Sequence, residues 1–128
     1  MPIQKILVVD DSPTERYFLT DVLIKHGFSV STAENGEEAL TKIKADKPEL
    51  ILMDVVMPGA NGFQVTRTIV KDPEFGNVPV IICSSKNQET DRVWGMRQGA
   101  RAYMVKPVDA EQLLAKIAEI GAEAPAAE

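Results

Sequence analysis

Cysteine, long apolar runs and excess positive charge are all scarce in this sequence. Its 128 residues include one cysteine, Cys83, so an intrachain disulfide is excluded, which fits a reducing compartment. No apolar run approaches the roughly 20 residues of a membrane-spanning helix, and the first residues lack the pattern of a signal peptide. The sequence therefore predicts a cytoplasmic protein without membrane insertion.

Charge excludes further classes. The formal net charge is −5, whereas proteins that bind nucleic acid or anionic membranes cluster lysine and arginine. We therefore expect no nucleic-acid partner. Apolar residues make up 45% and charged residues 26%, which is ordinary for a globular protein with one hydrophobic core. The length suits a single domain.

Four short apolar runs predict β-strands. They lack polar alternation, which is typical of parallel strands covered on both faces. These runs are residues 6–9, 50–53, 78–83 and 103–105. A weaker run, residues 28–32, alternates apolar and polar side chains and predicts a less covered strand near an edge of the sheet.

Segments with helical periodicity separate these runs. The first helix follows the capping box Ser12–Glu15, has proline at its first position, and ends at Gly27. Others are predicted to start at Asn35, Asn61, about Gln88 and Asp109. The last helix is expected to end near Ile120, followed by a flexible tail over residues 122–128.

The order strand–helix, repeated five times, predicts an α/β fold. Right-handed crossovers between parallel strands give a doubly wound five-stranded parallel sheet in a three-layer sandwich, here over residues 1–121. Ligands in such sheets bind outside the carboxyl ends of the strands. The residues that follow each strand are therefore the candidate site.

Carboxylates, a hydroxyl and an ammonium group occur at these strand ends. Asp10 and Asp11 follow the first predicted strand, Asp54 the third, Ser84 the fourth and Lys106 the fifth. Three carboxylates close together repel one another unless a cation intervenes, and one lysine neutralises only one of them. Oxygen ligands without histidine or cysteine favour Mg²⁺ or Mn²⁺. The set predicts a site for a metal and a phosphoryl group, with Asp54 as nucleophile.

Each of these residues alone has an ordinary structural explanation. Aspartate after a strand often caps the next helix, although Ser12 is the expected cap here, which leaves both aspartates free. Ser84 and Lys106 alone are common loop residues. Asp54 is harder to explain structurally, because a carboxylate within an apolar strand is costly to bury without a partner. The combination is much more specific than any member.

These residues lie in motifs that resemble the receiver domains of two-component response regulators, the CheY-like fold. The matching stretches are VVDDS at 8–12, MDVVMPG at 53–59, Asn61-Gly62, Ser84, Gly99-Ala100 and YMVKP at 103–107. The resemblance covers the chain up to the tail. It implies that Asp54 accepts a phosphoryl group from a phosphohistidine of a sensor histidine kinase.

The resemblance also implies a role for the other site residues. Asp11, Asp54 and the backbone carbonyl of Val56 would ligate Mg²⁺, with Asp10 acting mainly through a bound water. Lys106 would pair with the phosphoryl group and precede a cis proline bond. Ser84 would turn to bond the phosphoryl group, and Tyr103 would then rotate inward. Val56 and Lys86 would border the path of an attacking water and tune the lifetime of the phosphate.

The helix predicted from about Gln88 to Gln98 is expected to be weak. Gly95 in its interior costs roughly 1 kcal/mol relative to alanine, and its apolar residues are few. A loosely held helix beside Tyr103 suits a switching surface. We therefore predict an output surface formed by Arg92, Trp94, Tyr103 and the last helix.

A narrower resemblance concerns the pathway. Residues 11–15, 55–59 and 88–95 resemble stand-alone receivers of the chemotaxis-like pathway that controls type IV pilus twitching motility. The resemblance implies signalling through an output protein of the pilus machinery, and we expect the chain to be a monomer. Flagellar chemotaxis, or a phosphate sink without an output partner, are the alternatives.

Two other functional classes are alternatives to a receiver domain. A haloacid dehalogenase-type phosphatase would have a D-x-D motif after its first strand, whereas this chain has Asp10-Asp11-Ser12 and no second acid at Val56. A flavodoxin-like FMN carrier would have a phosphate loop rich in serine, threonine and glycine there. Aromatic residues make up only 5% of the chain, which leaves few to sandwich a flavin.

Overall fold

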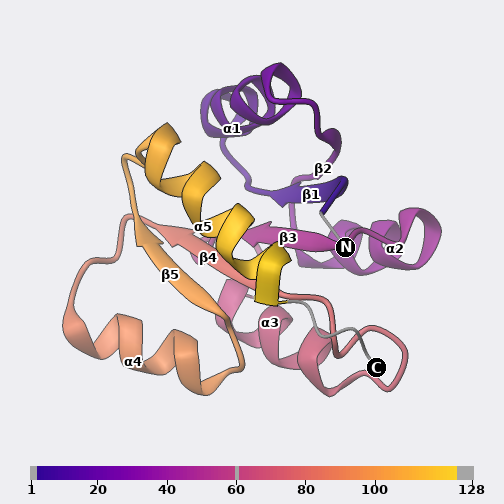
Figure 1. The fold of residues 1–128 in the computed structure, drawn as a ribbon. Helices are drawn as coiled ribbons and strands as arrows, with labels where there is room; N and C mark the ends of the chain where they lie inside the picture. Colours follow the sequence, from indigo (N-terminus) through magenta and orange to yellow (C-terminus); the bar gives the residue numbers. More distant parts are fainter. Residues whose placement is uncertain (1–2, 60, 124–128) are drawn as a thin grey trace.

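The structure is a computed structural model that describes residues 3–59 and 61–123. One sheet of five parallel strands forms its centre, in the order β2-β1-β3-β4-β5 (Figure 1). The strands are β1 (Lys5–Val9), β2 (Ser29–Ala33), β3 (Leu50–Met53), β4 (Val80–Ser84) and β5 (Ala102–Val105). The predicted doubly wound α/β fold is therefore confirmed.

Within the described residues, five helices alternate with the strands. They are α1 (Pro13–Lys25), α2 (Gly36–Asp46), α3 (Gly62–Lys71), α4 (Glu89–Arg97) and α5 (Ala110–Glu123). Side chains cap α1, α2 and α3 at the residues that the sequence predicts, although for α1 the structure gives only the Ser12 half of the predicted capping box. Ser12 Oγ accepts the N–H of Glu15 at 3.3 Å, and the side chain of Asn35 accepts the N–H of Glu38. Asn61 and Gln64 form a reciprocal capping box at the start of α3.

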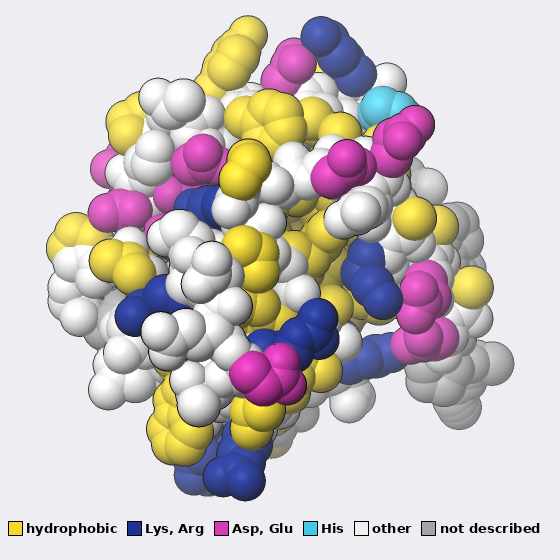
Figure 2. All heavy atoms as spheres, turned by 90° about the vertical axis from the view of Figure 1, so that its left-hand side faces the viewer, with side chains coloured by type: hydrophobic (Ala, Val, Ile, Leu, Met, Phe, Trp, Pro, Cys, Tyr) yellow, Lys and Arg dark blue, Asp and Glu magenta, His cyan; other side chains and the backbone are white. Residues whose placement is uncertain are grey.

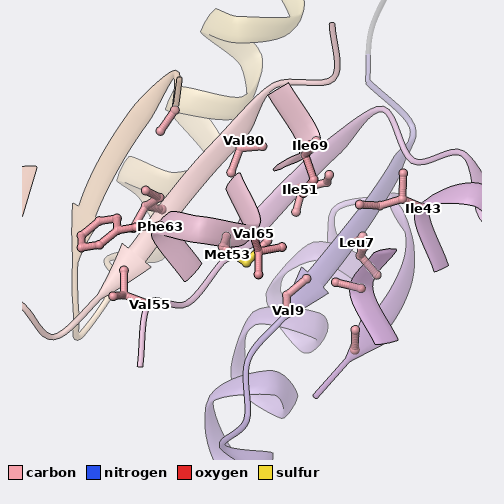
Figure 3. Packing of buried hydrophobic residues seen from close by; sticks show 14 of the residues in the cluster. Leu7, Val9, Ile43, Ile51, Met53, Val55, Phe63, Val65, Ile69 and Val80 are labelled. Carbon is pink, nitrogen blue, oxygen red and sulfur yellow. The ribbon is translucent and has the colours of Figure 1, made fainter. Parts of the chain in front are cut away.

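Two hydrophobic clusters fill the space between the sheet and the helices. One cluster joins side chains of β1, β3 and β4 to α2 and α3, and the other joins the opposite face of the sheet to α1 and α5. Figure 3 shows the first cluster, in which Val65 of α3 lies beside Met53, and Ile69 lies near Ile51 and Val80. Burying each large aliphatic side chain contributes roughly 1.5–3 kcal/mol, so these layers fix the sheet that carries the site.

The weakly apolar strand β2 lies at one edge of the sheet, as its alternation predicts. β5 lies at the other edge, and this position contradicts the expectation that its apolar run is covered on both faces. Val105 is 44% exposed and Met104 is only partly buried. A short apolar run indicates a strand, but it does not distinguish a central strand from an edge strand whose side chains serve another surface.

The last helix extends further than the sequence predicts. α5 continues through Ala122 to Glu123, two residues into the segment expected to be a flexible tail. Gly121 is buried in this last turn, next to Ile3, and Glu123 forms an ion pair with Arg101. The expected tail beyond residue 123 lies outside the described residues. None of the helices in residues 3–59 and 61–123 is long and apolar enough to cross a membrane.

Candidate phosphoacceptor and metal site

The predicted site residues meet at the carboxyl ends of the strands. Backbone hydrogen bonds continue one residue past β1, β3 and β5 and fix the positions of Asp10, Asp54 and Lys106. Asp10 N donates to Ala33 O at 3.0 Å, and Asp54 N donates to the carbonyl that ends β1 at 2.9 Å. Lys106 N donates to Ser84 O at 2.9 Å. β1 and β3 are adjacent where the strand order reverses, which is where such sheets bind ligands.

Three carboxylates converge there, as predicted. Carboxylate oxygens of Asp10, Asp11 and Asp54 lie within 4.8 Å of one another. Asp10 is 1% exposed and Asp54 6% exposed, whereas Asp11 is open to solvent. Figure 2 views the side toward which the strands' carboxyl ends point, and acidic side chains gather around a basic one in its upper left.

Lys106 is the cation nearest these acids. Its Nζ lies 2.7 Å from Asp10 Oδ2 and 3.3 Å from Asp54 Oδ1. The peptide bond between Lys106 and Pro107 is cis, as the family resemblance implies. The ammonium group therefore bridges the two buried carboxylates, and it lies closer to Asp10 than to Asp54.

Electrostatics leave this site short of positive charge. Burial, and then the charge of Asp10, raise the pKa of Asp54 to about 6, against the opposing effect of Lys106. Burial lowers the pKa of Lys106, but the hydrogen bond to Asp10 and the charge of Asp54 outweigh it and leave the pKa above its ordinary value. One lysine thus faces more carboxylate charge than it neutralises, and the oxygen donors suit a hard divalent cation.

Asp10 has a second role that the sequence did not indicate. Its Oδ1 accepts the N–H of Ser12 at 2.9 Å, so one oxygen stabilises the turn into α1 while the other pairs with Lys106. Ser12 is the N-cap of α1, as predicted, and Asp10 adds a contact to the turn before the helix while its other oxygen stays available to Lys106. Arg16 also contacts this turn, because its Nη1 donates to Asp10 O at 2.8 Å. The sequence indicated this contact only by placing Arg16 in the first two turns of the predicted helix.

Gly62 holds the backbone of Asp54 in place from the other side. Its N–H donates to Val55 O at 2.8 Å. A Cβ at Gly62 would lie 1.9 Å from the carbonyl oxygen of Asp54 and 2.8 Å from Val55 Cα. Only glycine lets α3 begin so close to the acceptor strand. The sequence identified Gly62 as part of a motif but gave no reason for it.

The two predicted switch residues contact the same loop residue. Ser84 is fully buried at the end of β4, and its Oγ accepts the N–H of Lys86 at 3.1 Å. Tyr103 Oη donates to Lys86 O at 2.8 Å. Tyr103 is 7% exposed, and burial raises the pKa of its hydroxyl. Its ring lies inward in this structure, while the predicted rotation between two positions stays a prediction.

The predicted output residues lie around α4 and β5. Arg92 and Tyr103 line a groove together with Val105 and residues of α5, including Gln112 and Lys116. Trp94 is 51% exposed, and Val93 and Met96 on the same short helix are each 41% exposed. Hydrophobic side chains also appear at the lower edge of Figure 2, on the side where Figure 1 places α4. Val56 is exposed beside the acids, and Lys86 is exposed in the loop before α4.

A model of the response regulator receiver domain matches residues 6–118. The chain belongs to this family. Receiver domains act as phosphoacceptor switches, with a histidine kinase as phosphodonor and a downstream protein as partner, so the prediction of a receiver rather than a phosphatase is confirmed. The chain is 58% identical to Protein PilH of Pseudomonas aeruginosa over 113 residues, which are 88% of this chain and 93% of that protein.

Solved receiver structures share the fold. A response regulator structure from Chloroflexus aurantiacus has a TM-score of 0.89 at 29% identity and covers 95% of this chain and 99% of that one. A chain of the CheX–CheY complex with BeF₃ and Mg²⁺ from Borrelia burgdorferi has a TM-score of 0.85 at 28% identity and covers 91% of this chain and 88% of that one. These receiver structures match the fold predicted for the chain.

Proposed function

We propose that Asp54 accepts a phosphoryl group from a phosphohistidine of a sensor kinase. The observation that carries this proposal is the buried Asp54 carboxylate, which lies at the end of the central strand β3, 3.3 Å from Lys106 Nζ and beside two further acids. In the transfer, the bond between phosphorus and the histidine nitrogen breaks as a bond between phosphorus and an Asp54 oxygen forms. Asp54 attacks as the carboxylate, so the step needs no proton transfer from this residue.

Mg²⁺ or Mn²⁺ is the metal that the donor set fits. Asp10, Asp11, Asp54 and the backbone carbonyl of Val56 are the proposed ligands, with Asp10 acting mainly through water. The bound metal supplies charge neutralisation between the carboxylates and the incoming phosphoryl oxygens. Asp10 also orients Lys106 through the 2.7 Å contact, which keeps the ammonium group next to the acceptor oxygen.

Lys106 and Ser84 donate to the phosphoryl oxygens. The Ser84 hydroxyl accepts the N–H of Lys86 and still has its own hydrogen to donate, because a hydroxyl both accepts and donates. Turning this hydroxyl toward a phosphoryl oxygen changes its geometry with Lys86, whose carbonyl accepts from Tyr103. Ser84 and Tyr103 thereby form a two-state element that phosphorylation biases.

Output is proposed to pass through the surface that holds Arg92, Trp94 and Tyr103. Its exposed hydrophobic side chains and its groove against α5 suit a protein partner. The proposed pathway is the chemotaxis-like control of type IV pili and twitching motility. The identity of 58% with Protein PilH, over most of both chains, supports this pathway. We further propose that the chain is monomeric.

Acetyl phosphate with Mg²⁺ tests the acceptor directly. We expect one phosphoryl group per chain, located on Asp54 by mass spectrometry and lost in Asp54→Asn. Asp21→Asn, which changes an exposed carboxylate paired with Lys25 on α1, is the matched control and should label normally. Stoichiometric labelling that persists in Asp54→Asn would refute the assignment, and removal of Mg²⁺ by EDTA should abolish labelling of the parent chain.

Capture of partners distinguishes output from a phosphate sink. Phosphorylated and unphosphorylated chains are each used to capture purified pilus-motor and flagellar-switch proteins. Preferential capture of a pilus protein by the phosphorylated form is the expected result, and it should be lost when Arg92, Trp94 and Tyr103 are changed together. Capture of a flagellar protein would replace the pilus proposal, and labelling without any state-dependent capture would favour the sink.

A further inference from the structure

Gly95 occupies an unusual position in α4. Of the nine residues of this helix, all of which the structure describes, Gly95 is the one that is buried, while Val93, Trp94 and Met96 are exposed. Glycine is less favourable than alanine in a helix interior. The buried residue of α4 is therefore also the residue that stabilises the helix least.

The neighbours of Gly95 explain the missing side chain. A Cβ at this position would lie 3.0 Å from Tyr103 Cδ2, 3.2 Å from Tyr103 Cε2 and 3.0 Å from Ile82 Cδ1. Carbon atoms in favourable contact are about 3.5–4.0 Å apart. The ring of Tyr103 thus fills the space where a side chain at Gly95 would begin.

The two neighbours differ in their freedom to move. Ile82 is fully buried in β4 and packs within the cluster between the sheet and α3. Tyr103 is paired with Ile82 across β4 and β5, but it lies on the edge strand, and its hydroxyl donates a hydrogen bond to Lys86 O in an exposed loop. A methyl group at Gly95 would therefore be accommodated most easily by an outward turn of the Tyr103 ring.

We propose that Gly95 is a positioning residue. Its missing side chain leaves a space, called the Gly95 seat below, that the inward Tyr103 ring occupies, so that a side chain at Gly95 shifts Tyr103 outward. The position of the ring is inferred from the contacts of Gly95. Only the further step, that an outward shift changes output, rests on the proposed function. The proposal predicts that a side chain at Gly95 moves the Tyr103 ring without preventing labelling of Asp54. The acceptor chemistry lies among the acids, and none of its residues is among the three nearest contacts of a Cβ at Gly95.

Fluorine NMR of Gly95→Ala tests the seat. The chain has two tyrosines, so 3-fluorotyrosine gives two signals, and Tyr17, which is 74% exposed, is an internal reference. In the unphosphorylated variant, the Tyr103 signal should acquire a solvent isotope shift close to that of Tyr17. An unchanged Tyr103 signal would overturn the proposal. This measurement needs no phosphate, so its failure is distinct from a failure to label Asp54.

Gly121→Ala is the matched control. Gly121 is also buried within a helix, but a Cβ there would lie 3.7 Å from its nearest neighbours in Ile3, which is ordinary contact. It should leave both fluorine signals unchanged. The same shift of the Tyr103 signal in this control would overturn the proposal, because it would show a general response to alanine substitution.

A double-mutant cycle keeps the test decisive if Gly95→Ala folds poorly. Urea denaturation is measured for the parent, Gly95→Ala, Tyr103→Ala and the double variant. If the ring fills the seat, the destabilisation caused by Gly95→Ala should shrink or reverse when Tyr103 is already alanine. Equal effects of Gly95→Ala in both backgrounds would overturn the proposal.

Output provides the functional readout. Gly95→Ala should still accept one phosphoryl group on Asp54, but the ratio of partner affinity between the phosphorylated and unphosphorylated forms should fall toward one. A variant that labels normally and keeps the full parent ratio would contradict the role of the seat in switching.

Discussion

The centre of the sheet and its β5 edge are built in opposite ways. At the centre, β1 and β3 have nearly all their apolar side chains buried, and backbone hydrogen bonds extend past the strand ends to fix Asp10 and Asp54. At the edge, α4 buries one glycine, and its larger apolar side chains are exposed. The difference separates two tasks. Chemistry needs rigid placement of charged groups, whereas a switch needs an element whose alternative positions differ little in free energy.

Among changes at the site, the largest expected effect is at Gly62, because a Cβ there would meet the backbone of Asp54 and Val55. Gly62→Ala places a Cβ against the backbone of Asp54 and Val55, and overpacking of this kind costs about 3 kcal/mol. We expect a loss of that order in the free energy of unfolding, measured by urea denaturation, together with loss of Asp54 labelling. Gly121→Ala should cost little. Similar stability of the two variants would show that the centre is less rigid than described.

Lys106→Met should have the next largest effect. It leaves the nearly fully buried Asp10 without its ammonium partner, at a cost of roughly 2 kcal/mol in metal-free protein at neutral pH. Mg²⁺ should restore part of this stability, because it neutralises the same carboxylates. Lys116→Met, which removes an exposed lysine paired with Glu119, is the control. Equal destabilisation of the two variants would contradict the charge balance of the site.

Asp54→Asn should stabilise the metal-free protein above pH 6. Burial raises the pKa of Asp54 from its ordinary value of 3.8 to about 6 in the folded protein, so the folded state holds the proton more tightly. Stability from this group is therefore present below about pH 4 and lost as the pH rises through 6. Removing the charge should raise the free energy of unfolding by about 1–2 kcal/mol at pH 8.

The pH dependence provides the control for that variant. The difference between Asp54→Asn and the parent should disappear near pH 4 in EDTA, where both side chains are neutral. With saturating Mg²⁺ at pH 8, the parent should gain more stability than the variant. A stability difference that is constant from pH 4 to pH 8 would mean that burial does not raise the Asp54 pKa.

The smallest expected effect is at Trp94 on the edge. Because half of this side chain is exposed, Trp94→Ala should change the free energy of unfolding by only about 0.5 kcal/mol. Truncating Ile82, which is fully buried one strand away, should cost about 2–5 kcal/mol as Ile82→Ala. Calorimetry of both variants compares the edge with the core, and a large loss for Trp94→Ala would show that α4 is firmly packed.

Much of the fold and of the site followed from the sequence, because both depend on strand ends. Apolar runs located the strands, and parallel strands bring their carboxyl ends together, so Asp10, Asp54 and Lys106 could be grouped before any contact was known. The edge position of β5 could not be predicted from its run of residues 103–105. Strand order depends on which faces the helices cover, and that is a property of the assembled layers.

Contacts that depend on distances of a few ångströms also escaped prediction. The sequence marked Gly95 only as a weak point of a helix, whereas the structure places the Tyr103 ring against it. The structure likewise explains Gly62 and Arg16. Gly62 lies against the backbone of Asp54, and Arg16 donates to the backbone carbonyl of Asp10. Such close approaches arise from tertiary packing, for which a single residue type gives little local signal.

We expect phosphorylation at the rigid centre of the sheet to move α4 at the loosely held β5 edge, and Trp94 on α4 reports on that movement directly. It is the only tryptophan, so its emission comes from α4 alone. Addition of acetyl phosphate and Mg²⁺ should change the Trp94 emission in the parent chain, with the same rate constant as Asp54 labelling, and should leave Asp54→Asn unchanged. Full labelling of Asp54 without any change in Trp94 emission would contradict the account.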